Sequence, residues 1–227
     1  MLDGFAKLVI DVPDLNRAVQ DYSVLFGEMH GTPTLPYIAL GNIGIELRAL
    51  PTADAAEISE LWLWRDADSA GVSAAPADCR GLSVQVTRHR EVAAAGKVSA
   101  SGIQAVDHLV LQTTDADDCI RLFGDDGFGM RLALDQLVPQ WGGRMLFFRC
   151  GKLTLEVIHN LEQPPLRDHF WGLTFQCPDL DATLAALDSA GVAHSEVRAG
   201  RKPGTRVATI KSHDLGIPTL LLEPALR

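Results

Sequence analysis

The sequence predicts an α+β fold built from repeated βαβββ units, and three observations support this. Four segments share one pattern, in which a short apolar strand is followed by a polar turn and then a helix. Three of these segments place an aspartate seven residues after their first position, where it can accept amide protons of the first helical turn: Asp14, Asp115 and Asp179. Three segments continue into a hairpin whose last apolar run holds one glutamate: Glu46, Glu156 and Glu223.

Each complete unit can be followed along the chain. The first has its strand from Lys7, a helix that ends near Gly27, and a hairpin over 36–50. The third starts at His108 and has a shorter helix, followed by a hairpin over 143–159. The fourth starts at Gly172 and ends with a hairpin over 205–224.

The second segment breaks this pattern. It starts at Gly81, and too few residues separate it from His108 to hold three further strands, so this unit is truncated or incomplete. Residues 51–79 resemble a connector with one short amphipathic element. We therefore predict a degenerate N-terminal pair of units over 1–100, with the second unit truncated, and a complete C-terminal pair over 104–227.

Composition excludes several classes of function. The net charge of −9 argues against a nucleic-acid surface, and no apolar run approaches the length of a membrane span. The four cysteines form no CxxC pair, which is typical of free thiols in a reducing compartment. The first apolar segment is too short for a signal peptide, so we expect a soluble cytoplasmic protein without nucleic-acid or membrane partners.

The repeat and its strand-end glutamates resemble the vicinal oxygen chelate superfamily, which includes glyoxalase I, bleomycin-resistance proteins, methylmalonyl-CoA epimerases and extradiol dioxygenases. The resemblance covers nearly the whole chain and is strongest over 105–225. It implies paired modules whose curved sheets enclose a cup-shaped cavity, with the helices outside. It also implies metal ligands on the first and last strand of each module, which here are His108, Glu156, Gly172 and Glu223; all but Gly172 can bind a metal.

The residues themselves leave two interpretations open. Glu156 and Glu223 are bounded by leucines, and a buried carboxylate needs a cation or a raised pKa. A divalent metal (Mn, Zn, Ni, Co or Fe) held by both glutamates and His108 would satisfy all three side chains. Alternatively, each glutamate ends its strand at a solvated rim, and His108 donates to a backbone carbonyl. Under the first interpretation, analogy makes Glu156 or Glu223 the catalytic base.

Two further positions bear on the site. Lys7 occupies the histidine position of the first unit, where its ammonium can neutralise Glu46, so we expect the N-terminal half to be structural. His169 lies three residues before Gly172, and this odd offset predicts that it faces away from the site unless a bulge intervenes.

Candidate substrate-binding residues surround these positions. The alternation of strand side chains places Gln112, Thr174 and Gln176 on the face of the cavity. Further candidates are aromatic or basic, although core packing or a solvated turn accounts for them equally well: Trp141, Trp171, Arg201 and Arg206.

The leading hypothesis is a metal-dependent isomerase, lyase or epimerase that acts on a small oxygenated substrate chelated to the metal. The alternative is a metal-free protein of the bleomycin-resistance type that binds a small molecule. A ring-cleaving dioxygenase is disfavoured because Gly172 leaves one histidine where that chemistry requires two. The open sheet edge of the short second unit favours a homodimer.

Overall fold

The computed structural model describes residues 2–65, 76–89, 99–124 and 126–225, and its three helices and fourteen strands confirm the α+β class. The first βαβββ unit has the predicted order, and its elements are β1 (Gly4–Val12), α1 (Leu15–Phe26), β2 (His30–Thr32), β3 (Leu35–Ala39) and β4 (Gly44–Ala49).

The third and fourth units also follow the predicted order. The third consists of β7 (Ala105–Gln112), α2 (Ala116–Phe123), β8 (Arg131–Val138), the 3-10 turn η1 (Pro139–Trp141), β9 (Gly143–Cys150) and β10 (Leu153–Asn160). The fourth consists of β11 (His169–Gln176), α3 (Leu180–Ser189), β12 (Arg198–Ala199), β13 (Arg206–Ile210) and β14 (Thr219–Glu223).

Aspartates begin all three helices, as the sequence predicts. Asp14 accepts from the amide of Arg17, Asp115 from those of Asp117 and Asp118, and Asp179 from that of Ala182. Each side chain satisfies amide donors that have no partner inside the helix, which contributes about 1 kcal/mol per helix. The repeated aspartate therefore fixes where the chain turns from strand to helix.

The interpretation of the second unit from the sequence is wrong. Its first strand is β5 (Glu57–Trp64), which pairs antiparallel with β1 and lies in the segment predicted to be a connector. The segment near Gly81 instead forms β6 (Ser83–Thr87), which runs parallel to β5 as β4 does to β1. The chain after Gly81 is thus the last strand of the unit. In the described part of the chain, no strand lies between β5 and β6.

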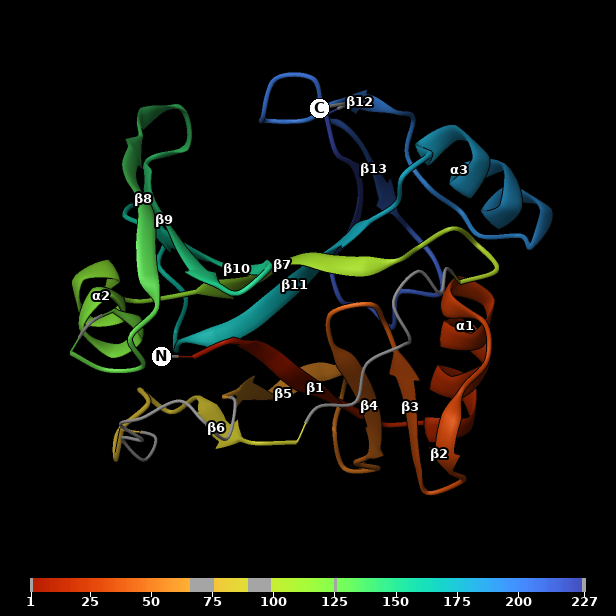
Figure 1. Ribbon diagram of the computed structural model, residues 1–227, viewed down its shortest axis with the longest axis horizontal. Coiled ribbons are helices and arrows are strands. Elements are labelled where there is room, and N and C mark those ends of the chain that lie inside the picture. Colours follow the sequence, from red (N-terminus) through yellow and green to blue (C-terminus); the bar gives the residue numbers. More distant parts are fainter. Residues whose placement is uncertain (1, 66–75, 90–98, 125, 226–227) are drawn as a thin grey trace.

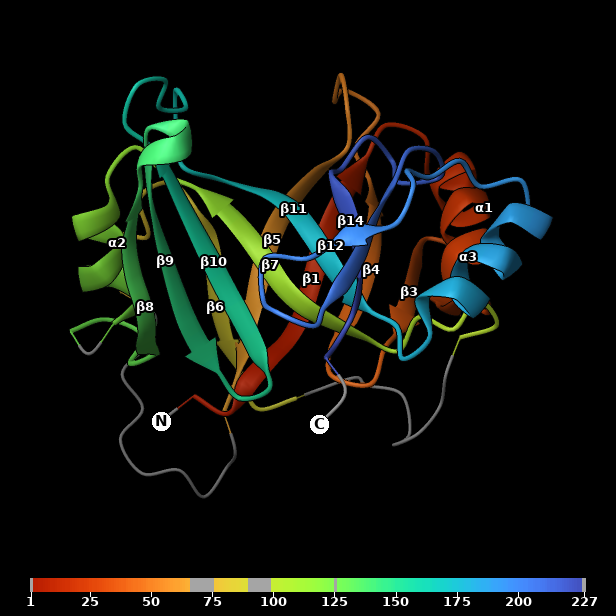
Figure 2. The same ribbon diagram turned by 90° about the horizontal axis from the view of Figure 1, so that it is seen from above.

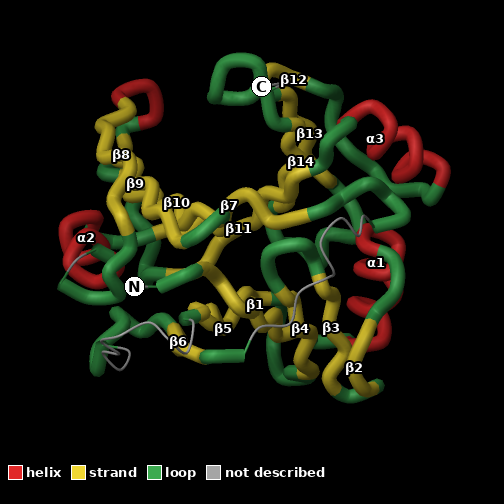
Figure 3. Tube along the Cα trace, in the orientation of Figure 1, coloured by secondary structure: helices red, strands yellow, loops and turns green. Residues whose placement is uncertain are grey.

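The strands join into one sheet with the order β2-β3-β4-β1-β5-β11-β7-β10-β9-β8, with β6 on β5 and β14-β13-β12 branching from β11. The strands of the C-terminal half lie side by side from β8 to β14, with α2 at one end and α1 and α3 at the other (Figures 1 and 2). In cross-section this half curves into a trough, with β7 and β11 at its base and β8–β9 and β13–β14 as walls (Figure 3).

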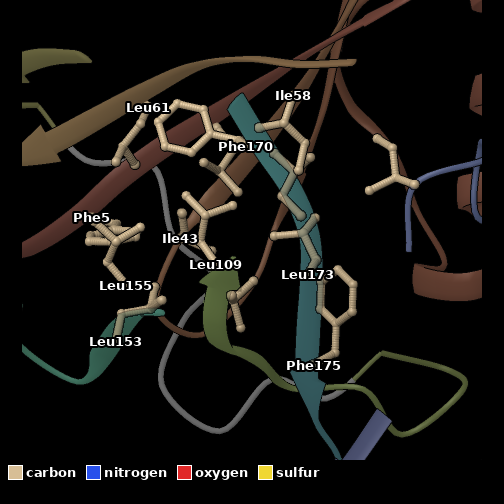
Figure 4. Packing of buried hydrophobic residues seen from close by; sticks show 14 of the residues in the cluster. Phe5, Ile43, Ile58, Leu61, Leu109, Leu153, Leu155, Phe170, Leu173 and Phe175 are labelled. Carbon is tan, nitrogen blue, oxygen red and sulfur yellow. The ribbon is translucent and has the colours of Figure 1, made fainter. Parts of the chain in front are cut away.

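The convex side of the trough packs against the N-terminal half. Leu109 and Leu173 point from β7 and β11 into one core with Phe5, Ile58 and Leu61, and all five are nearly inaccessible to solvent (Figure 4). Each such side chain contributes about 2 kcal/mol when buried. This packing leaves the concave face of β7 and β11 uncovered by the N-terminal half.

A buried ion pair connects three segments of the chain. Arg80, just before β6, donates through Nε to Asp168 (2.6 Å) and through its other nitrogens to Asp118 and Thr114. The Asp168 side chain is 1% exposed and also accepts from the Thr114 amide (2.8 Å) and the Thr113 hydroxyl (2.9 Å). Arg80 thereby connects the second unit to the start of α2 and to the segment that enters β11.

No helix in the described ranges is long and apolar enough to cross a membrane. All four cysteines are free thiols, as predicted.

Asp168→Asn should lower the free energy of unfolding by about 2 kcal/mol, because it leaves Arg80 facing a neutral amide in a buried network. Urea denaturation measures this change. Glu57→Gln serves as the control, because it breaks a solvent-exposed ion pair in which the Glu57 side chain is 46% exposed and that of Arg167 is 67% exposed. Its effect should stay within about 0.5 kcal/mol, and equal effects of the two variants would contradict the role of Asp168.

The contribution of Asp168 should also depend on pH. Burial raises the pKa of Asp168, but hydrogen bonds from Arg80, Thr113 and Thr114 outweigh it and hold the pKa below its ordinary value. The contribution is therefore complete above the unfolded pKa of about 3.9 and is lost as the pH falls through the lower folded value. The stability difference between wild type and Asp168→Asn should shrink below about pH 4 in urea titrations, and a constant difference would contradict this.

Candidate functional site

The candidate site lies on the concave face of the C-terminal trough. His108 on β7 is opposite Thr154 on the parallel strand β10, so Glu156 lies two residues further along on the same face. Across the antiparallel strand β11, His108 is opposite Thr174. The sheet therefore brings His108, Glu156 and Thr174 together from three strands.

The imidazole of His108 contacts a carboxylate at each nitrogen. Its Nε2 lies 3.1 Å from Oε2 of Glu156, and its Nδ1 lies 2.9 Å from Oδ2 of Asp107. A β-bulge explains the second contact: Thr174 pairs with His108 and Phe175 with Val106, which leaves Asp107 as an extra residue beside the histidine. Asp107 was not among the predicted site residues, because a bulge has no signal in strand alternation.

The two carboxyl groups differ in their electrostatics. Burial raises the pKa of Glu156, and His108 and Arg201 offset only part of that rise. Burial also raises the pKa of Asp107, but hydrogen bonds from His108 and Gln176 and the charge of Arg149 lower it by more. A neutral imidazole has one proton, so the Nε2–Glu156 contact needs a second proton when Asp107 takes the Nδ1–H. Either an imidazolium or a protonated Glu156 supplies that proton.

The fourth unit contributes no metal-binding side chain next to His108 and Glu156. Glu223, predicted as a metal ligand and base, lies on the opposite face of β14 with Leu221 and accepts from the Leu180 amide at the start of α3 (2.8 Å). Its other contact is with Arg206 at 3.5 Å. The prediction that Glu223 joins His108 and Glu156 is therefore wrong. Leu220, which follows Gly172 by the same interval as Glu156 follows His108, takes the position of the last-strand ligand.

Gly172 marks a position closed to any side chain. A Cβ atom there would lie 2.7 Å from the carbonyl oxygen of Pro218, and the Leu173 amide donates to that same oxygen at 2.9 Å. The carbonyl is held by sheet pairing and cannot move away independently. The glycine is thus required by the approach of β14, and a histidine could not be accommodated without moving that strand.

The donor set does not fit the divalent metal that the family resemblance implies. Of the four first- and last-strand positions, only those of His108 and Glu156 carry donors, and these two side chains contact each other directly. Among the described residues, no three His, Cys, Asp or Glu side chains converge as a metal site would require.

In the N-terminal half, the positions equivalent to those of His108, Glu156 and Gly172 carry a different set of side chains. Lys7 Nζ lies 2.9 Å from Glu46 Oε2, which confirms the predicted ion pair. A bulge at Ser59 aligns Glu60 with the position of Gly172, and Glu60 is paired with Arg48 at 2.5 Å. Both carboxylates are therefore neutralised by basic side chains. Glu60 was not among the predicted site residues, because the second unit was predicted to start at Gly81.

The predicted substrate-binding residues divide into two groups. Gln112 and Thr174 share the concave face with His108, Gln176 donates to Asp107, and Arg201 lies over the ring of Phe147 at 5.7 Å.

The remaining candidates lie elsewhere or are not described. Arg206 faces α3, where it pairs with Asp181 at 2.6 Å, so its prediction as a cavity residue is wrong. Trp171 is 41% exposed at a second bulge of β11. This bulge pairs His169 with Gln112 and turns it to the concave face, contrary to the odd-offset argument. The side chain of Trp141 lies outside the described part of the structure.

Gly172→Ala should lower the free energy of unfolding by about 2 kcal/mol, because the methyl group would press on the Pro218 carbonyl. Gly4→Ala in β1 is the control, since a Cβ there would meet nothing within 4 Å. Its effect should stay within about 0.5 kcal/mol in urea denaturation. If Gly172→Ala unfolds like wild type, the position is not sterically closed.

Comparison with known proteins supports this architecture. Residues 105–214 match the model of the Glyoxalase/Bleomycin resistance protein/Dioxygenase superfamily, whereas no curated protein matches the sequence. A triple mutant of 4-hydroxymandelate synthase from Streptomyces coelicolor superposes with a TM-score of 0.71 at 14% identity, covering 100% of this chain and 94% of that one.

Two further solved structures are similar. A xylose isomerase-like TIM barrel/4-hydroxyphenylpyruvate dioxygenase fusion protein has a TM-score of 0.68 at 14% identity, covering 100% of this chain and 50% of that one. Methylmalonyl-CoA epimerase from Mycobacterium tuberculosis has a TM-score of 0.49 at 23% identity, covering 58% of this chain and 95% of that one. At these identities the full-length likenesses establish the fold alone. The family match assigns residues 105–214 to the glyoxalase/bleomycin resistance/dioxygenase superfamily, and the full-length likeness shows that the whole chain has the fold of the matched synthase.

Proposed function

We propose that the protein binds a small organic molecule on the concave face of its C-terminal trough without a chelated metal. The observation that carries this proposal is the loss of both donors in the fourth unit, where Gly172 and Leu220 stand at the ligand positions. Glu223, the remaining candidate, is held by the Leu180 amide and Arg206 on the outer face.

The lining of this face suits an organic ligand. Val110, Met145 and Val207 are each at most 6% exposed, yet they lie outside the main hydrophobic core. They share the concave face with the polar group of Asp107, His108 and its neighbours. Apolar walls with a few converging polar groups are typical of small-molecule sites. This combination favours the alternative of a binding protein over the metal-dependent isomerase, lyase or epimerase.

The test is a thermal-shift screen of small organic compounds, run once with EDTA and once with added Mn, Zn, Ni, Co or Fe(II). Compounds that bind should raise the melting temperature equally in both conditions. Purified wild type and His108→Ala should both contain less than about a tenth of an equivalent of metal. His30→Ala, on the distant strand β2, is the control. The proposal is contradicted if compounds bind only in the presence of metal and if His108→Ala loses a bound metal that wild type and His30→Ala retain.

A second candidate function, metal-independent proton transfer, is favoured by the chain Asp107–His108–Glu156. A carboxylate on Nδ1 orients the imidazole, and the carboxyl group on Nε2 can exchange a proton with it. Glu156 retains 14% exposure on the concave face, so a bound molecule could approach it. Such an arrangement can remove and return a proton on carbon.

Some compounds found in the thermal-shift screen will carry an acidic C–H group. With the protein in D₂O, these compounds should exchange that proton for deuterium, and NMR measures the rate of exchange. Glu156→Gln should slow the exchange by about 100-fold while changing the Kd by less than about threefold. Exchange at the same rate in wild type and Glu156→Gln would rule out proton transfer and would leave the binding function in place.

A further inference from the structure

Four arginines on the concave face form no ion pair with a carboxylate among the described residues, although the charge of Arg149 acts on Asp107 and that of Arg201 on Glu156. Arg149 lies opposite Thr154, which is itself opposite His108, and it donates to the Thr154 hydroxyl at 2.7 Å. Arg131 is the cross-strand neighbour of Arg149. The facing wall contributes Arg198, opposite Val207, and Arg201 from the loop after β12.

Arginines elsewhere in the described ranges are usually paired. Seven of them form an ion pair with a carboxylate: Arg17, Arg48, Arg80, Arg121, Arg144, Arg167 and Arg206. The chain has 29 acidic residues against 20 Lys and Arg, so carboxylates are abundant. Unpaired guanidinium groups gathered on one concave face of an acidic protein indicate a partner that is not part of the chain.

The pairing of Arg131 with Arg149 is unfavourable in the free protein. The two residues are directly opposite on β8 and β9, and like charges in that position destabilise a sheet. Both are exposed, so solvent screens part of the repulsion. A bound anion would remove the repulsion that remains.

Arg201 reaches from one wall of the trough to the other. Its guanidinium contacts the Met145 sulfur, lies 3.0 Å from Gln136 Oε1 and stacks over Phe147, which is opposite Glu156. These partners are all uncharged. A Cβ at Gly200 beside it would meet the Thr205 side chain across the same hairpin. Arg201 thus reaches Phe147, which lies two residues before Arg149 on β9 and on the same face.

We infer that the ligand of the concave face is an organic anion whose carboxylate or phosphate group binds between Arg149 and Arg201. Guanidinium groups recognise both oxyanions through paired N–H donors. The apolar body of the molecule would lie against Phe147 and Val110, beside His108. This inference rests on the proposed binding function and specifies the chemical class of its ligand.

Calorimetric titration with benzoate, phenyl phosphate and the neutral benzyl alcohol tests the inference. At least one of the two anions should bind about tenfold more tightly than benzyl alcohol, and raising NaCl from about 20 mM to about 500 mM should weaken it. Arg149→Gln and Arg201→Gln should each weaken anion binding by about tenfold. Arg17→Gln, which removes the same charge from α1, should leave it within about twofold.

Arg131→Gln provides a second test, because it should change the melting temperature of the free protein and the stabilisation by the anion in opposite directions. Without ligand it should raise the melting temperature by removing the repulsion from Arg149, whereas the stabilisation by the bound anion should decrease. The inference fails if neither anion binds, if benzyl alcohol binds as tightly as both anions, or if Arg149→Gln and Arg201→Gln behave like Arg17→Gln. The proposed function fails separately, when the screened compounds require a divalent metal.

Discussion

The antiparallel pairing of β7 with β11 is the constraint on which the C-terminal half depends. Side chains alternate across a strand, so the register that buries Leu109 and Leu173 in the core also turns His108 and Thr174 to the concave face. One face provides the apolar contact with the N-terminal half, and the other provides the polar group. A slip of one residue in this register would exchange the two faces and lose both.

The same repeat position has four different occupants. Lys7 neutralises Glu46, Glu60 is paired with Arg48, and His108 contacts Glu156, whereas Gly172 is closed by the Pro218 carbonyl. Burying an ionised carboxylate without a partner costs several kcal/mol. Each of these carboxylates has a basic or imidazole partner nearby, from its own unit or, for Glu60, from the first unit, so no common ligand set is needed to compensate its burial.

Arginine has two distinct roles in this acidic chain. Arg80 and its carboxylates join loops of the two halves, and Arg48 and Arg144 are likewise paired within the structure. Arg149 and Arg201 donate hydrogen bonds only to uncharged groups among the described residues. Paired arginines contribute to the stability of the fold, whereas the role that we propose for those on the concave face is ligand binding.

The sequence by itself determined the βαβββ units, their helix-capping aspartates and the ion pair of Lys7 with Glu46, because these depend on local chemistry and on a repeated spacing. The division of the chain near residues 100–104 remains a prediction. Only the tertiary structure decided that β5 begins the second unit, that Glu223 faces α3 and that bulges turn Asp107 and His169 toward the concave face. The reason is physical. The sequence of a single strand reveals how its side chains alternate, but it reveals neither the partner strand nor the position of a bulge. One inserted residue is enough to reverse the face on which the following side chains lie.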